Sequence, residues 1–287
     1  MLYGILSSVL YASSQIIDKH MMHYQHLDYK KAVALTSAIS VITLSLLGIF
    51  VFKINVLEFN FDFFTIALFA ALVLTAVFDF MLYFKGLSLT SVSDAQPYLT
   101  FSFFFIVIMA SVIYPQDITG VNHLIIALIA TGVLILSNFE RKHLVFSKAS
   151  IILLSSTFFL ALSKILAKGL VLSIDPFIVT IIQIFFMEIA LLVILRQSFK
   201  GTTKLNWISA FLTNALWILS LFFEYKSYEI IGIIDTVIIL SSVPLVATFL
   251  DVIILKERLK KRTIFATIVI TSCIIYLLLT APQLASI

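Results

Sequence analysis

Hydrophobic residues follow one another in long runs along almost the whole chain, and short polar stretches separate these runs. A helix needs about 20 largely apolar residues to cross roughly 30 Å of hydrocarbon. Ten runs approach that length, and together they take up most of the 287 residues. They cover residues 2–19, 32–52, 63–84, 92–113, 120–138, 149–170, 176–195, 205–225, 232–255 and 263–281. The pattern predicts an all-α, polytopic membrane protein with ten transmembrane helices and no room for a soluble domain.

The composition excludes a water-soluble fold. Hydrophobic residues make up 61% of the chain and charged residues only 12%, whereas a soluble domain carries about 25% charged residues. Cys273 is the single cysteine, which rules out an intrachain disulfide and a thiolate metal cluster. The first run has no positively charged leader and no small-residue cleavage site, so we expect a retained helix. The net charge of +4 comes from loop residues, and we expect no nucleic-acid partner.

The two halves of the chain resemble each other at a spacing of 141 residues, since residues 84–94 align with residues 225–235. Each half holds five hydrophobic runs, and an odd number of spans turns the second half upside down relative to the first. Inverted repeats of this kind are typical of secondary transporters, which bind their cargo midway through the bilayer. We expect the repeats to cover residues 1–143 and 144–287.

Basic residues in the loops are strongly biased to one side of the predicted membrane. The loops after the first, third, fifth, seventh and ninth runs carry 14 lysines and arginines, and the other loops carry 3, namely Lys53, Lys168 and Lys226. We call these two sides the basic face and the opposite face. The positive-inside rule predicts that the basic face lies in the cytoplasm, with both termini outside the cytoplasmic membrane.

Short motifs in both halves carry a family resemblance. Residues 241–250 read SSVPLVATFL, residues 255–259 read LKERL, and residues 12–19 read ASSQIIDK. The serine–proline pair, the glutamate before the last helix and the lysine at the end of the first span resemble the EamA-like branch of the drug/metabolite transporter superfamily. The resemblance extends over nearly the whole chain and implies a ten-helix membrane transporter.

The chain departs from the pattern of that family in two respects. In the first half, Phe103 stands where Pro244 predicts a proline, and Gln116 stands where Glu257 predicts a glutamate. Members of the family usually keep both termini in the cytoplasm, which is the reverse of the orientation that the basic residues predict. We follow the charge count for the orientation.

Three ionisable residues, Asp79, Lys164 and Glu188, lie inside predicted spans and several residues from either end. Each costs about 2.5–3.5 kcal/mol on insertion scales, so an intramembrane charge is a functional-site hypothesis by default. The functional interpretation is a substrate counter-charge or a proton relay, and the structural alternative is an ion pair between Lys164 and one acid. Asp251 and Glu224 lie nearer the ends of their spans and rank lower.

Other polar side chains gather on single helix faces at helical spacing. The residues of interest are Ser14 and its neighbour Gln15, then Gln183, Asn214 and Trp217. A polar stripe either lines a cavity or forms interhelical hydrogen bonds worth about 0.6 kcal/mol on average. Trp217 and Tyr98 also offer flat aromatic faces, which suit a cation or a ring-bearing solute.

Pro244 predicts a kink in the ninth span. It has no N–H and it crowds the carbonyl of Leu240, which loses its helical partner in mid-membrane. That carbonyl then needs Ser241, Ser242, water or cargo as its partner. The kink either presents backbone polarity to a cavity or is a packing feature repaired by the serine hydroxyls.

These features favour a secondary transporter of a small organic metabolite that works by alternating access. An acidic cavity with one lysine favours a cationic or zwitterionic solute, such as an amino acid or an amine. The chain lacks a Gly-x4-Gly-Lys-Ser/Thr loop, so we expect no nucleotide or other cofactor and no metal, and the energy would come from exchange or from protonation of Asp79 or Glu188. The alternatives are a lipid-modifying membrane enzyme, built on His20, His23 and His26, and a non-transporting membrane subunit.

Overall fold

The fold is that of a computed structural model, which describes residues 1–23, 25, 27–46, 62–89, 98–118, 121–138, 147–197, 199–255 and 261–280. Within those ranges the chain is helical apart from short turns, and it contains no strand. The prediction of an all-α protein is confirmed. Glu257 lies outside the described residues, so the interpretation that rests on it stays a prediction.

The helices follow the hydrophobic runs in order. The first half contains α1 (Leu2–His23), α2 (Tyr29–Leu46), α3 (Phe63–Leu87), α5 (Phe101–Ile113), the 3₁₀ turn η3 (Pro115–Asp117) and α6 (Val121–Asn138). The second half contains α7 (Lys148–Val171), α8 (Pro176–Leu195), α9 (Lys204–Ile231), α10 (Ile233–Leu240), α11 (Val243–Leu255) and α12 (Lys261–Thr280). Polar capping residues explain where several of them begin. Thr203 and Asn206 form a capping box at the start of α9, and the Asp175 side chain caps α8.

The ninth predicted span is broken into α10 and α11 by a turn at Ser241 and Ser242. The two serine hydroxyls donate to the carbonyls of Ile238 (2.6 Å) and Ile239 (2.7 Å). Of the four partners considered for the Leu240 carbonyl, the two serines are therefore ruled out, because each hydroxyl donates to the carbonyl three residues before it. Water and cargo stay predictions.

The first half is interrupted at the equivalent position. Tyr98 and Leu99 are helical, Thr100 forms a turn, and α5 starts at Phe101. Thr100 lies 141 residues before Ser241, so the break falls at the same place in both repeats. Phe103 occupies the position of Pro244 in this repeat, which means that the break does not require a proline at this position.

The exterior is apolar and much of the interior is polar, the reverse of a soluble protein. Phe63 is 87% exposed and Leu279 is 81% exposed, whereas Ser37, Ser40 and Thr131 are fully buried. Buried hydroxyls of this kind hold helices together in lipid, where hydrophobic burial cannot. Four described helices are long and apolar enough to cross a membrane on their own, at Phe63–Gly86, Lys148–Val171, Pro176–Leu195 and Lys204–Ile231.

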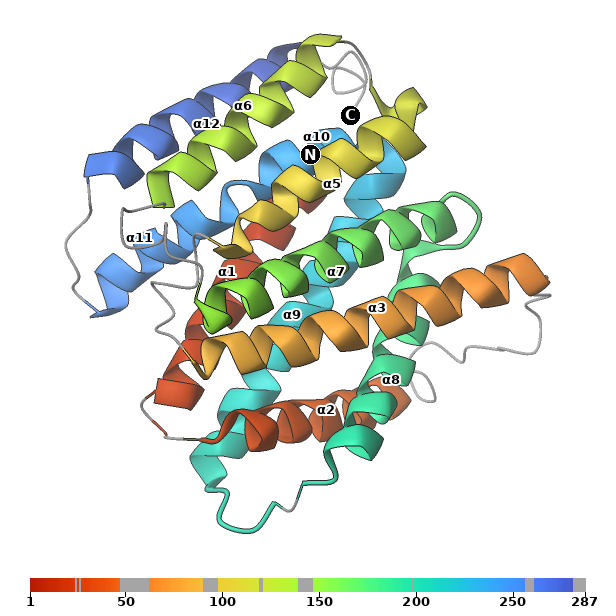
Figure 1. The fold of residues 1–287 in the computed structure, drawn as a ribbon, viewed down its shortest axis with the longest axis vertical. Helices are drawn as coiled ribbons and strands as arrows, with labels where there is room; N and C mark the ends of the chain where they lie inside the picture. The colour runs from red at the N-terminus through yellow and green to blue at the C-terminus, as the bar shows by residue number, and fades with distance from the viewer. Residues whose placement is uncertain are drawn as a thin grey trace.

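The helices pack in pairs that stay the same when each helix is replaced by its counterpart in the other repeat. α1 packs along α9, and the corresponding helices of the other repeat, α7 and α3, pack along each other. α2 packs on its own counterpart α8, and α6 on its counterpart α12, which lie side by side in Figure 1. The faces that meet at the centre therefore come from both repeats.

Candidate functional site

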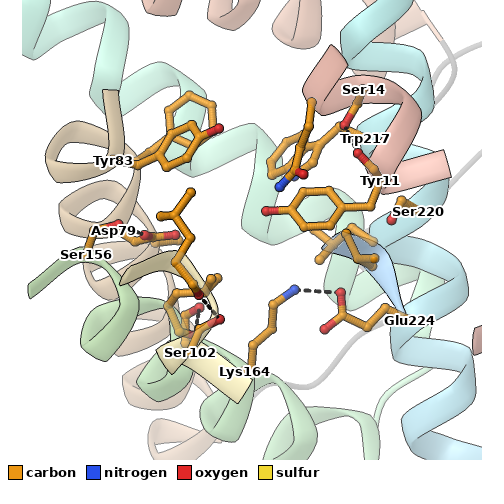
Figure 2. A pocket seen from close by; sticks show the side chains of 18 of the residues that line it. Tyr11, Ser14, Asp79, Tyr83, Ser102, Ser156, Lys164, Trp217, Ser220 and Glu224 are labelled. Carbon is orange, nitrogen blue, oxygen red and sulfur yellow. Dashed lines mark hydrogen bonds and ion pairs between the residues drawn. The ribbon is translucent and has the colours of Figure 1, made fainter. Parts of the chain in front are cut away.

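A cavity lies between the two repeats, and its walls come from both of them (Figure 2). Counting the part open to solvent, the space between its atoms amounts to about 1430 Å³. On α1 and α3 most of the lining residues, such as Asp18 and Tyr83, lie in the half of the helix nearest the basic face. Lys164 of α7 and Glu224 of α9 lie in the half nearest the opposite face. The cavity thus spans the middle of the protein and continues towards the basic face.

Most of the residues selected from the sequence meet in this cavity. Its lining includes Ser14, Gln15, Asp79, Lys164, Gln183, Asn214, Trp217 and Pro244. Ser241, Ser242, Tyr98 and Glu188 are not part of the lining. Tyr98 is buried against Leu153 instead, because its position before the break in the first repeat turns it towards α7.

Two carboxylates of the cavity are held by hydroxyl groups. Ser156 donates to Asp79 Oδ1 over 2.6 Å, and Thr213 donates to Asp18 Oδ1 over 2.9 Å. Asp18 and Tyr11 follow Ser14 at helical spacing, so the sequence contains a signal for both of them. Ser156 had no such signal, because a serine in an apolar helix is common and only packing against α3 gives it a partner.

Lys164 forms an ion pair, although with neither of the acids expected from the sequence. Its Nζ lies 2.7 Å from Glu224 Oε2 and 5.5 Å from the centre of the Tyr225 ring. The hydroxyl of Tyr228 donates to the other oxygen of Glu224. The low rank given to Glu224 was therefore wrong, since α9 continues to Ile231 and keeps this carboxylate inside the protein.

One acceptor in the cavity is left without a partner. Gln15 Oε1 is buried and accepts no hydrogen bond from any described group. A buried acceptor in this condition costs free energy that a donor on a ligand would recover.

Tyr11 and Trp217 lie on the wall across from Asp79 and Ser156 (Figure 2), so aromatic surface faces the carboxylate.

A second ion pair, together with the hydrogen bonds around it, closes the end of the cavity nearest the opposite face. Lys168 Nζ lies 3.0 Å from Asp117 Oδ2 and donates to the Tyr228 carbonyl over 2.8 Å. The same Asp117 oxygen accepts the N–H of Ile233 over 2.9 Å. We call these contacts the Lys168 latch. The sequence places Lys168 in a loop, but its side chain is only 3% exposed because α7 continues to Val171.

A histidine and an aspartate support the same closure. His123 Nδ1 of α6 lies 2.9 Å from Asp235 Oδ1 in the first turn of α10. Both side chains are less than a tenth exposed. Gly232, just before α10, has φ of +81°, and a Cβ there would lie 3.1 Å from the Asp117 carboxylate. Residues of η3, α6, α7 and α10 are therefore locked together on this side.

Glu188 lies behind the cavity wall, at the contact of α8 with α2. Ser37 and Ser40 of α2 both reach its carboxyl group, at 2.5 Å and 3.1 Å. Ser40 also lies 2.7 Å from Asn214 Oδ1, and Asn214 lines the cavity. The cluster connects the buried carboxyl to the cavity through two side chains.

The profile of the EamA-like transporter family matches residues 1–138 and again residues 147–279. The chain belongs to the EamA-like transporter family. It is accordingly a multi-pass membrane protein of two inverted repeats and a membrane transporter of small solutes, which agrees with the resemblance and the repeat found in the sequence. Residues 139–146 separate the two matched segments, and the boundary between the repeats at residue 143 stays a prediction.

A solved structure supports the fold. It is described only as "Crystal structure of protein" and superposes with a TM-score of 0.70 over 99% of this chain and 98% of that chain, at 14% identity. No curated protein matches the sequence.

The side chains of His23 and His26 lie outside the described residues, so the enzyme alternative stays untested. No cluster of three metal-ligating side chains occurs in the part of the chain that is described.

Proposed function

We propose that this EamA-like protein is a secondary transporter of small organic cations or zwitterions with an amine group, and that it works by alternating access. The observation that carries the proposal is the charge of the cavity. Asp18, Asp79 and Glu224 line it together with a single base, Lys164, so its formal charge is 1 − 3 = −2.

Three of the acceptors that line the cavity are available to a ligand. Lys164 is already paired with Glu224, whereas Asp18 and Asp79 have only hydroxyl donors as described partners. Gln15 Oε1 has none. An ammonium group carries a positive charge and three N–H donors, so it complements acceptors of this kind. The hydroxyls of Tyr11 and Tyr83 and the indole N–H of Trp217 also line the cavity, but these donors are neutral, so an anion would still meet a net negative charge.

Aromatic surface favours the same ligands. Tyr11, Tyr83 and Trp217 line the cavity, and a cation over such rings gains about 0.5–2 kcal/mol. An amine carried on a ring or a short apolar chain would contact both the rings and the carboxylates.

Alternating access would follow from the two-fold packing. The cavity is closed towards the opposite face by the Lys168 latch, and rocking the repeats would open that side while closing the basic face. We infer that the basic face is cytoplasmic, as its lysines and arginines predict. A reporter fused to the C-terminus tests this orientation, and a cytoplasmic signal would contradict it.

Transport in proteoliposomes tests the substrate class. Organic cations, zwitterionic amines and organic anions of similar size are offered in turn, and we expect uptake of the first two classes only. Asp79→Asn should weaken cation binding at least about tenfold, equivalent to roughly 1.4 kcal/mol. Glu229→Gln is the control, because it removes the same charge from a side chain that is 40% exposed and outside the cavity. Uptake of anions, or equal effects of the two variants, would refute the proposal.

A further inference from the structure

Glu188 is a fully buried carboxyl group without a basic partner among the described residues. Its polar contacts in that part of the chain are the hydroxyls of Ser37 and Ser40. The other helices packed against α8 are α3, α7 and α9. Titratable groups in the middle of these helices are Asp79, Tyr83, Lys164, Glu224 and Tyr225. Lys164 pairs with Glu224, Asp79 accepts from Ser156, and Tyr225 donates to Gln183, so their described bonds point elsewhere.

The orientation of Asn214 decides how hydrogens are distributed around Glu188. Asn214 Nδ2 lies 2.5 Å from the carbonyl of Thr36. A carbonyl can only accept, so the amide nitrogen must face it and the amide oxygen must face Ser40. Ser40 therefore stands between two acceptors, Asn214 Oδ1 at 2.7 Å and Glu188 Oε1 at 3.1 Å.

An ionised Glu188 leaves one of these contacts without a hydrogen. The two serines supply one hydroxyl hydrogen each, but the carboxylate and the amide present three oxygens that only accept. Two oxygens would then face each other within hydrogen-bonding distance in a dry interior, where an unsatisfied polar contact is costly.

A neutral Glu188 satisfies every contact. Its own O–H donates to Ser40, Ser40 donates to Asn214 Oδ1, and Ser37 donates to the other carboxyl oxygen. Each short oxygen–oxygen distance in the cluster then contains one hydrogen. The neutral state of Glu188 therefore follows from the positions of four side chains.

We propose that Glu188 is the proton-binding site of this transporter and that it exchanges its proton against the cationic solute. The inference rests on the proposed function for the cargo, though not for the protonation state itself. The cluster in this conformation holds Glu188 as a neutral carboxylic acid.

Asn214 links the two events because it contacts both the cavity and Ser40. A cation in the cavity favours a negative charge on Glu188 through electrostatic attraction. An N–H of the solute that binds Asn214 Oδ1 also frees the Ser40 hydroxyl to donate to Glu188 Oε1. The carboxyl then releases its proton to water in the cavity and becomes a carboxylate. One positive charge enters the site and one leaves it, so no other reactant is needed.

Infrared spectroscopy of the purified protein tests the protonation state without any substrate. We expect the C=O stretch of a neutral carboxylic acid in the wild type, and its loss in Glu188→Gln. Ser40→Ala serves as a second variant, because it removes the acceptor of the acid proton and should shift the frequency of that band. A spectrum in which Glu188→Gln removes only a carboxylate band would overturn the inference.

Transport tests the coupling separately. A 1:1 exchange converts a tenfold proton gradient into a cation gradient of up to about tenfold, since the two driving forces are equal. We expect Glu188→Gln to lose this accumulation while it still exchanges labelled for unlabelled cation. Retained accumulation would refute the role of Glu188. If wild-type protein exchanged no cation at all, the proposed cargo would be wrong, and the infrared result would still decide the state of Glu188.

Discussion

Lys168 offers the sharpest test of how the closed side of the cavity is held. Its ammonium group lies 3.0 Å from Asp117, and these two side chains are 3% and 11% exposed. Replacing lysine by methionine keeps the length of the side chain and removes the charge. Asp117 would then remain buried with the N–H of Ile233 as its described partner. We therefore expect Lys168→Met to destabilise the conformation that is closed at the opposite face.

The size of the effect follows from the burial of the pair. Removing one partner of a buried ion pair costs about 3–5 kcal/mol, because the remaining charge is left uncompensated. When the opposite face opens, Asp117 meets water and this cost disappears. The lower value of about 3 kcal/mol corresponds to a shift of roughly 100-fold in the ratio of the two conformations, since 1.4 kcal/mol is tenfold. The double variant Lys168→Met with Asp117→Asn should recover much of the shift, because no charge is left unpaired.

Thiol labelling from the opposite face measures this shift. Ala167 is fully buried and lies 149 residues after Asp18, which lines the cavity on the basic side. When the two repeats exchange their conformations and the cavity opens to the opposite face, Ala167 should line it as Asp18 does here. An Ala167→Cys substitution in a Cys273→Ser background provides a single thiol, and an impermeant reagent reports its exposure. We expect Lys168→Met to accelerate labelling strongly.

Lys226→Met is the matched control. Lys226 also pairs with a carboxylate, Glu229, but the two side chains are 30% and 40% exposed. Pairs of this kind contribute about 0–1 kcal/mol, so labelling should stay near the rate of the parent. Equal labelling rates in the Lys168 and Lys226 variants would show that the latch does not hold the cavity shut.

Four further substitutions test the packing, the helix break and the helix cap. Gly86→Ala should lower the stability to heat by about 1–3 kcal/mol, because its Cβ would lie 2.5 Å from Leu153. Gly132→Ala is the control, because a Cβ at this position meets open space, and the substitution should be neutral or stabilising. Unchanged melting of Gly86→Ala would contradict the close contact of α3 with α7. Pro244→Ala should retain the helix break and transport, because the first repeat breaks at Thr100 with Phe103 in the position of Pro244, and a loss of uptake would show that the two breaks differ. Thr203→Ala should cost about 1 kcal/mol in chemical denaturation through loss of the capping box, and an unchanged midpoint would show that the box contributes nothing.

The sequence by itself determined the fold class, the repeat and the presence of a polar centre. Apolar runs of membrane-spanning length can only be satisfied as helices in lipid, and this requirement is local. Asp79 and Lys164 could be selected for the same reason, since a charge in the middle of such a run needs an explanation wherever the helix lies. Both line the cavity.

Only the tertiary structure decided which groups meet. Lys164 pairs with Glu224 and not with Asp79 or Glu188, and Lys168 is buried against Asp117 although it looked like a loop residue. Such pairings depend on the rotation of each helix about its axis and on its depth relative to its neighbours. The periodicity of one helix contains neither quantity, because both are set by packing against helices from the other repeat.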